Sequence, residues 1–276
     1  MSLRLDGHVA LVTGAGRGIG RAHALLLAER GAGIVVCDVG VALDGSGADP
    51  SPAAGVVEEI RAAGGAAVAD TSDISTFAGA AAAVATGVEA FGKVDIVVNN
   101  AGLTGGASLE DVTEEVLERQ FAVHVVGSVG TAKAAWPMMR AQRWGRVVNT
   151  VSEAAFPSRI TGGRGGGLGY GTAKAAVWAA TYGMAAEGAP HGITVNAISP
   201  GAATRMNEAM FRDAPPSLDL DPRHVARVVA WLVSDDAADV NAKVIHAAGG
   251  QHREYLMGRH AGTELVERLE RALGGT

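Results

Sequence analysis

The sequence has little of what a secreted, disulfide-bonded or zinc-binding protein needs. Its single cysteine, Cys37, cannot form an intramolecular disulfide, and no cysteine and histidine residues are spaced as zinc ligands. The first residues lack the apolar stretch of a signal peptide, and the longest run of low polarity, residues 78–88, is too short to cross a membrane. We therefore expect a cytoplasmic protein with no metal site and no membrane partner.

Positively charged residues are outnumbered as well. The chain has 23 lysines and arginines against 29 aspartates and glutamates, a formal net charge of −6 at pH 7. Nucleic acids and anionic lipid surfaces attract basic proteins, because both carry dense negative charge. The charge balance therefore argues against both classes of partner.

Glycine is the residue type in excess. The chain has 39 glycines among 276 residues, about twice the usual share of roughly 7%. It contains only 9 prolines and no repeat, so it is neither collagen-like nor disordered in composition. The glycines must therefore be concentrated at particular turns.

Short, continuously apolar segments alternate with helical segments along the chain. Continuous rather than alternating apolar strands indicate a sheet that is covered on both faces, and strands joined by helices indicate parallel pairing. The pattern predicts an α/β fold, a doubly wound (Rossmann) parallel sheet of about seven strands with helices on both faces. The expected strands are 8–13, 34–38, 66–70, 94–99, 146–151, 193–198 and 243–247, and the expected helices are 21–30, 53–63, 77–91, 110–142, 170–187 and one starting near 221.

No linker rich in proline or serine divides the chain, which predicts a single domain over residues 1–276. Two segments depart from the alternation. One is a glycine-rich insertion at 153–169, and the other is a C-terminal extension at 250–276 that ends in a charged, helix-like stretch at 264–273.

A glycine-rich turn, TGAGRGIG at residues 13–20, lies between the first expected strand and the first expected helix. Glycine lets the backbone approach a pyrophosphate closely, and the free N–H groups at the start of a helix stabilise the phosphate charge. In this context the motif predicts a dinucleotide site rather than an ordinary turn. Its expected members are Gly14, Arg17, Gly18, Ile19 and Gly20.

Asp38 ends the second expected strand, 18 residues after Gly20. A carboxylate there accepts hydrogen bonds from the adenosine ribose diol and repels a 2′-phosphate, which favours NAD over NADP. Arg17 argues the other way, because a guanidinium near the ribose pairs with that phosphate. We give Asp38 more weight, since its carboxylate occupies the place of the phosphate.

Tyr170 and Lys174 are four residues apart and therefore share one face of a helix. A tyrosine is a poor base at neutral pH, but a neighbouring cation, together with an oxidised nicotinamide, favours the phenolate. Such a phenolate takes the hydroxyl proton of an alcohol while hydride leaves to the cofactor. Ser152, at the end of the fifth expected strand, is placed to hydrogen-bond the substrate oxygen.

Taken together, the turn at 13–20, the sequence NNAG at 99–102, Ser152, Tyr170-x-x-x-Lys174 and Pro200-Gly201 resemble the short-chain dehydrogenase/reductases of the non-extended branch. The resemblance implies Tyr170 as general acid and base, Lys174 as the group that holds the nicotinamide ribose and lowers the pKa of the tyrosine, and Ser152 as the group that orients the carbonyl. It also implies a homodimer or homotetramer. The further cofactor-binding residues that it implies are Asp73, Ile74, Asn100, Ala101, Gly102, Pro200, Gly201 and Thr204.

The sequence departs from this family at two positions. His124 stands where the family has an asparagine that holds a water in a proton relay; a histidine either passes protons itself or is a packed helix residue. Ser152 lies 18 residues before Tyr170, whereas the family spacing is usually about 13. We align Ser152 on its strand and treat the difference as an insertion, with Ser158 as the competing serine.

His124, residues 134–137 and residues 204–206 are similar to a subgroup, the (3R)-hydroxyacyl-CoA dehydrogenase domain of the peroxisomal multifunctional enzymes type 2. The expected function is therefore NAD-dependent interconversion of a secondary alcohol and a ketone, on a small-molecule substrate that is a 3-hydroxyacyl thioester or resembles a hydroxysteroid. The alternative is a non-catalytic protein that binds a dinucleotide to sense redox state. A scaffold subunit is a third reading, which rests only on the C-terminal extension.

Overall fold

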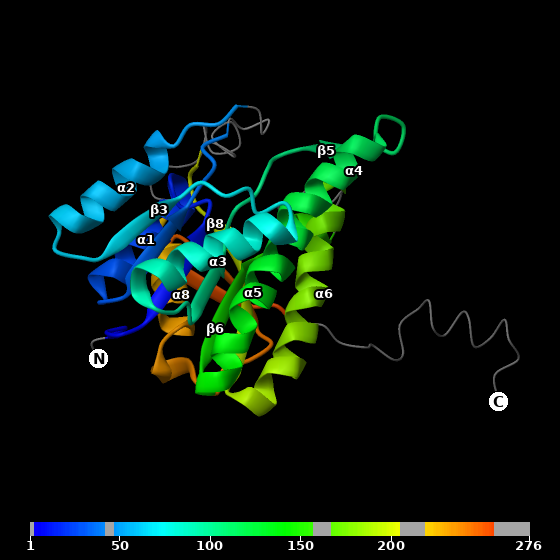
Figure 1. Cartoon of the computed structure of the whole chain (residues 1–276). Coiled ribbons are helices and arrows are strands. Elements are labelled where there is room, and N and C mark those ends of the chain that lie inside the picture. Colours follow the sequence, from blue (N-terminus) through cyan, green and yellow to red (C-terminus); the bar gives the residue numbers. More distant parts are fainter. Residues whose placement is uncertain (1–2, 42–46, 157–166, 205–218, 257–276) are drawn as a thin grey trace, which may run out of the picture.

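The fold is organised around one eight-stranded sheet (Figure 1). The computed structural model describes residues 3–41, 47–156, 167–204 and 219–256. The strands lie in the order β10-β9-β8-β6-β4-β1-β2-β3. Their bounds are β1 Val9–Thr13, β2 Gly33–Cys37, β3 Ala67–Asp70, β4 Ile96–Asn99, β6 Gly145–Thr150, β8 Ile193–Gly201, β9 Val244–Ala248 and β10 Gln251–Glu254.

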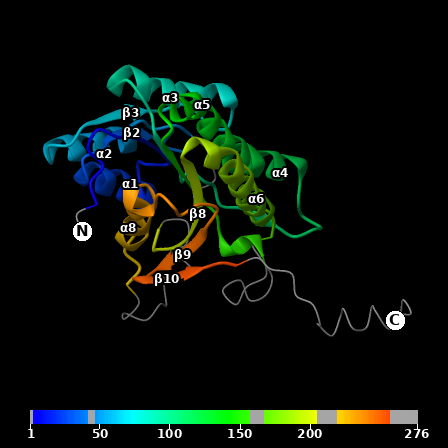
Figure 2. The ribbon, with the colours of Figure 1, turned by 90° about the horizontal axis from the view of Figure 1, so that it is seen from below.

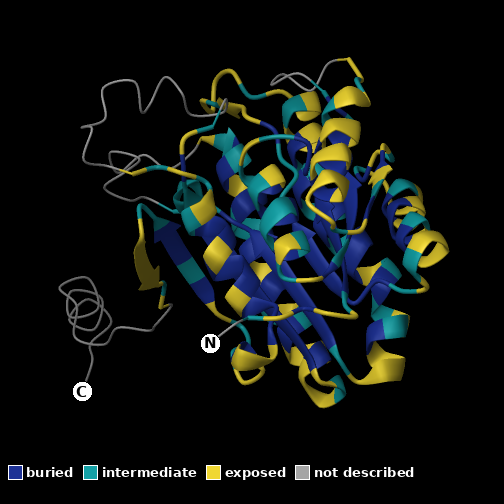
Figure 3. Ribbon diagram, turned by 90° about the vertical axis from the view of Figure 1, so that its left-hand side faces the viewer, coloured by how far each residue is buried: buried dark blue, intermediate teal, exposed yellow. Residues whose placement is uncertain are grey.

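Helices cover both faces of this sheet (Figures 1 and 3). Successive residues of a strand point to opposite faces, so Ala10 and Val12 of β1 pack into one apolar core and Val9 and Leu11 into another. The first core includes residues of α1 Gly18–Glu29, α2 Ser51–Ala62 and α8 Arg223–Leu232. The second includes residues of α3 Phe77–Phe91, α5 Gly127–Gln142 and α6 Tyr170–Gly188.

Seven strands run parallel, which confirms the predicted fold class. The eighth, β10, was not predicted and pairs antiparallel to β9 within the segment taken as a C-terminal extension. Gly249 and Gly250 have φ values of 53° and 75°, a left-handed conformation that reverses the chain between the two strands. All four residues of β10 are exposed at the edge of the sheet, so no apolar pattern marks the strand in the sequence (Figures 2 and 3).

The long helix expected at 110–142 is divided into three parts. The Thr113 side chain accepts a hydrogen bond from the Val116 amide at the start of α4, Glu114–Phe121. A π-helical turn, Ala122–Val126, then separates α4 from α5. Such wide turns interrupt regular helices mainly at functional sites, and this one has His124 at its centre.

The glycine-rich insertion is described only at its two ends. Its last residues form β7, Leu168–Gly169, which pairs antiparallel with β5, Gly106–Ala107, in a second small sheet. Ser158 lies outside the described residues, as does the helix-like stretch at 264–273. Within the described ranges, no helix is long and apolar enough to span a membrane, and no group of three or more acidic, histidine or cysteine side chains is arranged to hold a metal ion.

Candidate active site

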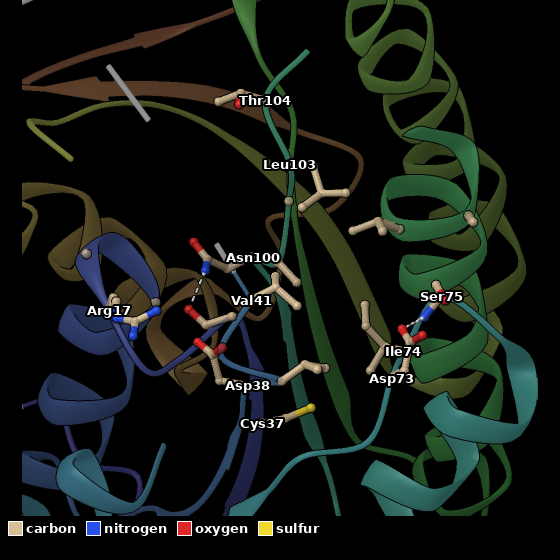
Figure 4. Close-up of a pocket in the computed structure, with 18 of the residues that line it drawn as sticks. Arg17, Cys37, Asp38, Val41, Asp73, Ile74, Ser75, Asn100, Leu103 and Thr104 are labelled. Carbon is tan, nitrogen blue, oxygen red and sulfur yellow. Dashed lines mark hydrogen bonds between the residues drawn. The ribbon is translucent and has the colours of Figure 1, made fainter. Parts of the chain in front are cut away.

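A cleft of about 520 Å³ opens where β1, β2, β3 and β4 end (Figure 4). In open parallel sheets, ligands bind beside the carboxyl ends of the strands, where helices begin. The cleft brings together twelve of the residues predicted to bind a cofactor. They are Gly14, Arg17, Gly18, Ile19, Gly20, Asp38, Asp73, Ile74, Asn100, Ala101, Gly102 and Thr204.

The glycine-rich turn lies against the end of β4, with no room for a side chain at Gly14 or Gly20. A Cβ on Gly14, whose φ is +64°, would be 2.8 Å from the Cα of Ala101, and a Cβ on Gly20 would be 2.0 Å from the Gly14 carbonyl oxygen. The Asn100 side-chain amide fixes this approach by donating to the carbonyl oxygens of Thr13 and Gly14. These contacts leave the start of α1 open to the cleft, where its free N–H groups and dipole favour a phosphate.

Asp38 lies beside this turn (Figure 4). Its carboxylate accepts hydrogen bonds of 2.7 Å from the backbone amides of Gly16 and Gly40, which hold it in the wall of the cleft. Arg17 also lines the cleft, but a guanidinium nitrogen lies 3.8 Å from a carboxylate oxygen of Asp49. The arginine that argued for NADP therefore has an acidic neighbour in the protein itself.

The cleft also contains residues that the motifs did not mark. For most of them the only signal is position, because they lie within a few residues of a marked position, either at the end of a strand or near His124; Gly47 has no such signal. These lining residues are Cys37, Val39, Val41, Gly47, Ser72, Ser75, Leu103, Thr104, Arg119, Ala122 and Val123.

Two predicted cofactor residues, Pro200 and Gly201, do not line the cleft. They end β8, and a Cβ on Gly201 would be 2.7 Å from the Cβ of Ala248 in β9. The glycine therefore allows two neighbouring strands to pack closely. Tyr170 and Lys174 also lie outside this cleft, in a cluster beside it.

The three predicted catalytic residues Ser152, Tyr170 and Lys174 form this buried cluster. Tyr170 begins α6 and its phenol is hydrogen-bonded to Ser152, which also accepts a hydrogen bond of 3.2 Å from the Ala154 amide. Lys174 lies one turn further along α6, only 3% exposed, with its ammonium 2.8 Å from the Thr150 carbonyl oxygen. The structure therefore brings the three side chains together, and their catalytic roles stay a prediction.

Burial sets the charge of the cluster. It lowers the pKa of Lys174 to about 7 and raises the pKa of the Tyr170 phenol, while the hydrogen bond from Ser152 offsets part of that increase. We expected Lys174 to lower the pKa of the tyrosine. Within the chain itself desolvation is the larger effect, because the ammonium lies 5.7 Å from the centre of the Tyr170 ring and is directed to Thr150.

His124 joins the cluster to the cleft. Its ring meets the Tyr170 ring edge-on with centroids 5.4 Å apart, and its Nε2 lies 3.3 Å from the carbonyl oxygen of Leu103 in the cleft wall. Burial, and then the nearby Lys174 charge, hold the pKa of His124 well below its usual value, so the ring is neutral. Its Nδ1 is buried and has no hydrogen-bond partner among the described residues.

Asn99, the first residue of the sequence NNAG, is buried in the interior of the fold. Its amide donates to the Ser128 carbonyl oxygen and to the Asn149 side chain, and it accepts a 2.6 Å hydrogen bond from Thr131. Such a buried polar network is stable only when every group has a partner. The network ties β4 to β6 and α5 directly beneath the cleft.

A family model described as short chain dehydrogenase matches residues 8–215. The chain belongs to this family. The match covers the glycine-rich turn, the NNAG segment, Ser152, Tyr170 and Lys174, and the α/β fold of this short-chain dehydrogenase agrees with it.

Among curated proteins, this short-chain dehydrogenase is 40% identical over 268 residues to peroxisomal multifunctional enzyme type 2 of Drosophila melanogaster, covering 97% of this chain and 43% of that protein. The chain therefore spans less than half the length of that relative. It is also 39% identical over 264 residues to a hydroxyacyl-CoA dehydrogenase of Mycobacterium tuberculosis, covering 90% of this chain and 79% of that protein.

Solved structures agree in fold. A short chain dehydrogenase from Mycobacterium avium has a TM-score of 0.81 and 39% identity, covering 98% of this chain and 96% of its own. A 7α-hydroxysteroid dehydrogenase complexed with NADH and 7-oxo glycochenodeoxycholic acid has a TM-score of 0.76 and 30% identity, covering 90% and 96%. A gluconate 5-dehydrogenase from Burkholderia cenocepacia in complex with NADP and tartrate has a TM-score of 0.78 and 30% identity, with the same coverage.

Proposed function

We propose that this short-chain dehydrogenase uses NAD to interconvert a secondary alcohol and a ketone, with a 3-hydroxyacyl thioester or a hydroxysteroid-like molecule as substrate. The observation that supports the reaction most strongly is the buried cluster of Ser152, Tyr170 and Lys174 beside a cleft lined by the glycine-rich turn. A phenol, a hydroxyl and an ammonium together bind the oxygen of an alcohol or ketone and move its proton.

The cleft residues fit a nicotinamide dinucleotide. The close approach of Gly14 and Gly20 to neighbouring backbone opens the helix N-terminus to a pyrophosphate, and the fixed carboxylate of Asp38 suits the two hydroxyls of an adenosine ribose. Asp73 and Ile74 line the other wall, where an adenine would bind (Figure 4). When bound, the oxidised nicotinamide accepts hydride and brings positive charge to the cluster.

The preference for NAD rests on Asp38. A 2′-phosphate at this wall would meet a carboxylate whose two oxygens already accept backbone amides and which therefore cannot turn away without losing both hydrogen bonds. The 7α-hydroxysteroid dehydrogenase structure contains NADH and the gluconate 5-dehydrogenase structure contains NADP, so family membership alone does not decide between the two.

In the proposed mechanism, Tyr170 takes the hydroxyl proton of the alcohol and returns it in the reverse direction. Ser152 holds the substrate oxygen, and its hydrogen bond favours the phenolate form of Tyr170. Lys174, held by the Thr150 carbonyl, supports that phenolate when it carries its charge. His124 contributes a neutral ring that fixes Leu103 and packs against the tyrosine.

The substrate class is proposed from the names of the relatives. The names of the hydroxyacyl-CoA dehydrogenase and of the 7α-hydroxysteroid dehydrogenase each specify a substrate with a hydroxyl group, on an acyl chain or on a steroid. A homodimer or homotetramer and a cytoplasmic location complete the proposal; the multifunctional relative is named peroxisomal. A protein that only senses a dinucleotide has no need of a buried acid and base, and this disfavours the non-catalytic alternative.

A substrate panel tests this proposal. Formation of reduced nicotinamide would be followed with 3-hydroxyacyl-CoA, hydroxysteroid, terpenoid and short secondary alcohols, each with NAD and with NADP. We expect turnover with NAD on one of the first two classes. Tight NAD binding without turnover on any alcohol or ketone would instead support the sensor.

A further inference from the structure

The turn that carries the catalytic serine is held from the far end of the chain. Glu153 follows Ser152 directly and begins a short 3-10 turn, Glu153–Ala155. The hydroxyl of Tyr255, 102 residues away, donates to the Glu153 carboxylate. Tyr255 lies just after β10, and its own amide donates to the Val244 carbonyl oxygen of β9 at 2.9 Å.

The ring of Tyr255 holds the other end of the same turn. It meets the ring of Phe156 edge-on with centroids 5.4 Å apart, and both rings pack against Trp178 of α6 at 5.5 Å. Aromatic pairs in this edge-on geometry add stability beyond that of the area that they bury. Tyr255 therefore contacts Glu153, the first residue of the turn, and Phe156, which directly follows its last residue.

Among the described residues, His246 and Arg253 also lie near this pair. His246 of β9 places Nδ1 3.9 Å from the carboxylate, beyond hydrogen-bond distance, and burial lowers the pKa of this histidine so that it is neutral. Burial and the Glu153 carboxylate both raise the pKa of the Tyr255 phenol, which therefore stays a donor. Arg253 acts on Tyr255 and His246 electrostatically and lies on the exposed strand β10.

We propose that Tyr255 is a positioning residue for catalysis, which holds the turn from Glu153 to Phe156 so that Ser152 stays within hydrogen-bond distance of Tyr170. The inference rests on the proposed function. Strand β10, which the sequence did not reveal, then has a role. It returns the chain along β9 (Figure 2), and the residue that follows it, Tyr255, binds Glu153 of the active-site turn.

Two of the three tyrosines of the chain, Tyr255 and Tyr182, provide a matched pair of variants. Tyr255→Phe keeps the ring contacts and removes only the hydroxyl that binds Glu153. Tyr182→Phe is the control, because Tyr182 belongs to the same apolar cluster, and its hydroxyl accepts a 3.0 Å hydrogen bond from Trp178 rather than binding Glu153. Glu153→Ala removes the partner carboxylate, and Glu153→Gln keeps an acceptor oxygen.

We expect kcat to fall about tenfold in Tyr255→Phe, since small displacements of a catalytic group reduce rates strongly, with KM for NAD unchanged. The acid limb of the pH profile of kcat/KM should move to higher pH, because Tyr170 loses the hydrogen bond that lowers its pKa while Lys174 and His124 remain. Glu153→Ala should match Tyr255→Phe, the double variant should be no slower, and Glu153→Gln should recover most of the rate.

Crystal structures of Tyr255→Phe and Glu153→Ala with NAD provide a readout that needs no substrate. The proposal predicts that Ser152 Oγ moves beyond hydrogen-bond distance of the Tyr170 hydroxyl. An unchanged turn in both variants overturns it, as does a kinetic and pH profile identical to that of Tyr182→Phe. A wild-type protein that turns over no alcohol contradicts the proposed function instead, and the crystal structures still decide this inference.

Discussion

The cleft proposed to bind the cofactor and the cluster proposed to be catalytic are neighbours that are built in different ways. The cleft is shaped mainly by backbone: the glycine-rich turn pressed against Ala101, and two amides that hold Asp38. The cluster consists of buried side chains, and burial works against the charged form of Tyr170, Lys174 and His124 alike. The cleft is therefore preorganised by the fold, whereas the cluster is electrostatically incomplete within the chain.

This difference indicates how the two regions depend on each other. A phenolate at Tyr170 needs positive charge nearby, and the chain supplies only a lysine whose pKa is about 7. In the proposed function, an oxidised nicotinamide bound in the neighbouring cleft would supply this positive charge. Loss of the Tyr170 hydroxyl should therefore affect turnover first, whereas changes in the cleft should affect cofactor binding first.

The strongest test of this separation is Tyr170→Phe. Loss of a general acid and base costs about 10²- to 10⁴-fold in rate, and we expect that loss in kcat. NAD affinity, measured by calorimetry, should change little, because the phenol does not line the cleft. Tyr182→Phe is the matched control. Full turnover in Tyr170→Phe would contradict the assigned role.

Gly20→Ala should disrupt the glycine-rich turn of the cleft. The new Cβ would be 2.0 Å from the Gly14 carbonyl oxygen, so the turn must shift. We expect a loss of about 1–3 kcal/mol in unfolding free energy, typical of overpacking, and weaker NAD binding. Gly55→Ala is the control, because its Cβ would meet nothing within 4 Å in α2. Equal NAD affinity in the two variants would contradict the close-packed turn.

Much of this architecture follows from the sequence, and the misses have physical causes. The strands were predictable because residues such as Val9 to Val12 are all buried and apolar, and the turn was predictable because side chains do not fit at positions 14 and 20. Strand β10 was missed because it is exposed and polar. The raised pKa of Tyr170 was missed because desolvation depends on packing between distant segments, which local spacing does not reveal.

His23→Leu tests the helix that follows the glycine-rich turn. His23 in α1 is fully buried, and neither ring nitrogen has a hydrogen-bond partner in the described structure. Burial lowers its pKa from 6.5 to about 3, so the unfolded chain takes up a proton below pH 6.5 that the folded protein refuses. The free energy of unfolding is therefore not reduced by His23 above pH 6.5, and it falls as the pH drops below that value.

Between pH 7 and pH 5 this linkage costs the wild-type protein about 2 kcal/mol. The leucine variant should lose less stability over the same interval, by about that amount, and should be the more stable protein at pH 5. Urea unfolding at the two pH values measures the difference. Identical pH dependence would show that His23 is not the buried neutral group described here.

The smallest expected effect concerns cofactor choice. Asp38→Ala removes the carboxylate that repels a 2′-phosphate and leaves Arg17 in the cleft. We expect the ratio of kcat/KM for NADP to that for NAD to rise about tenfold, the size of one charge-assisted interaction. Asp38→Asn keeps the shape without the charge and should shift the ratio in the same direction. An unchanged ratio in both variants would refute the role of Asp38.

The central claim is that a hydride passes between a carbinol carbon and a dinucleotide bound in the cleft. It can be tested directly by placing deuterium on the carbinol carbon of any alcohol that the protein oxidises and analysing the reduced nicotinamide by mass spectrometry. The account predicts that the deuterium is found in the cofactor and that turnover slows when the hydride step limits the rate. Deuterium recovered in water, with none in the nicotinamide, would contradict it.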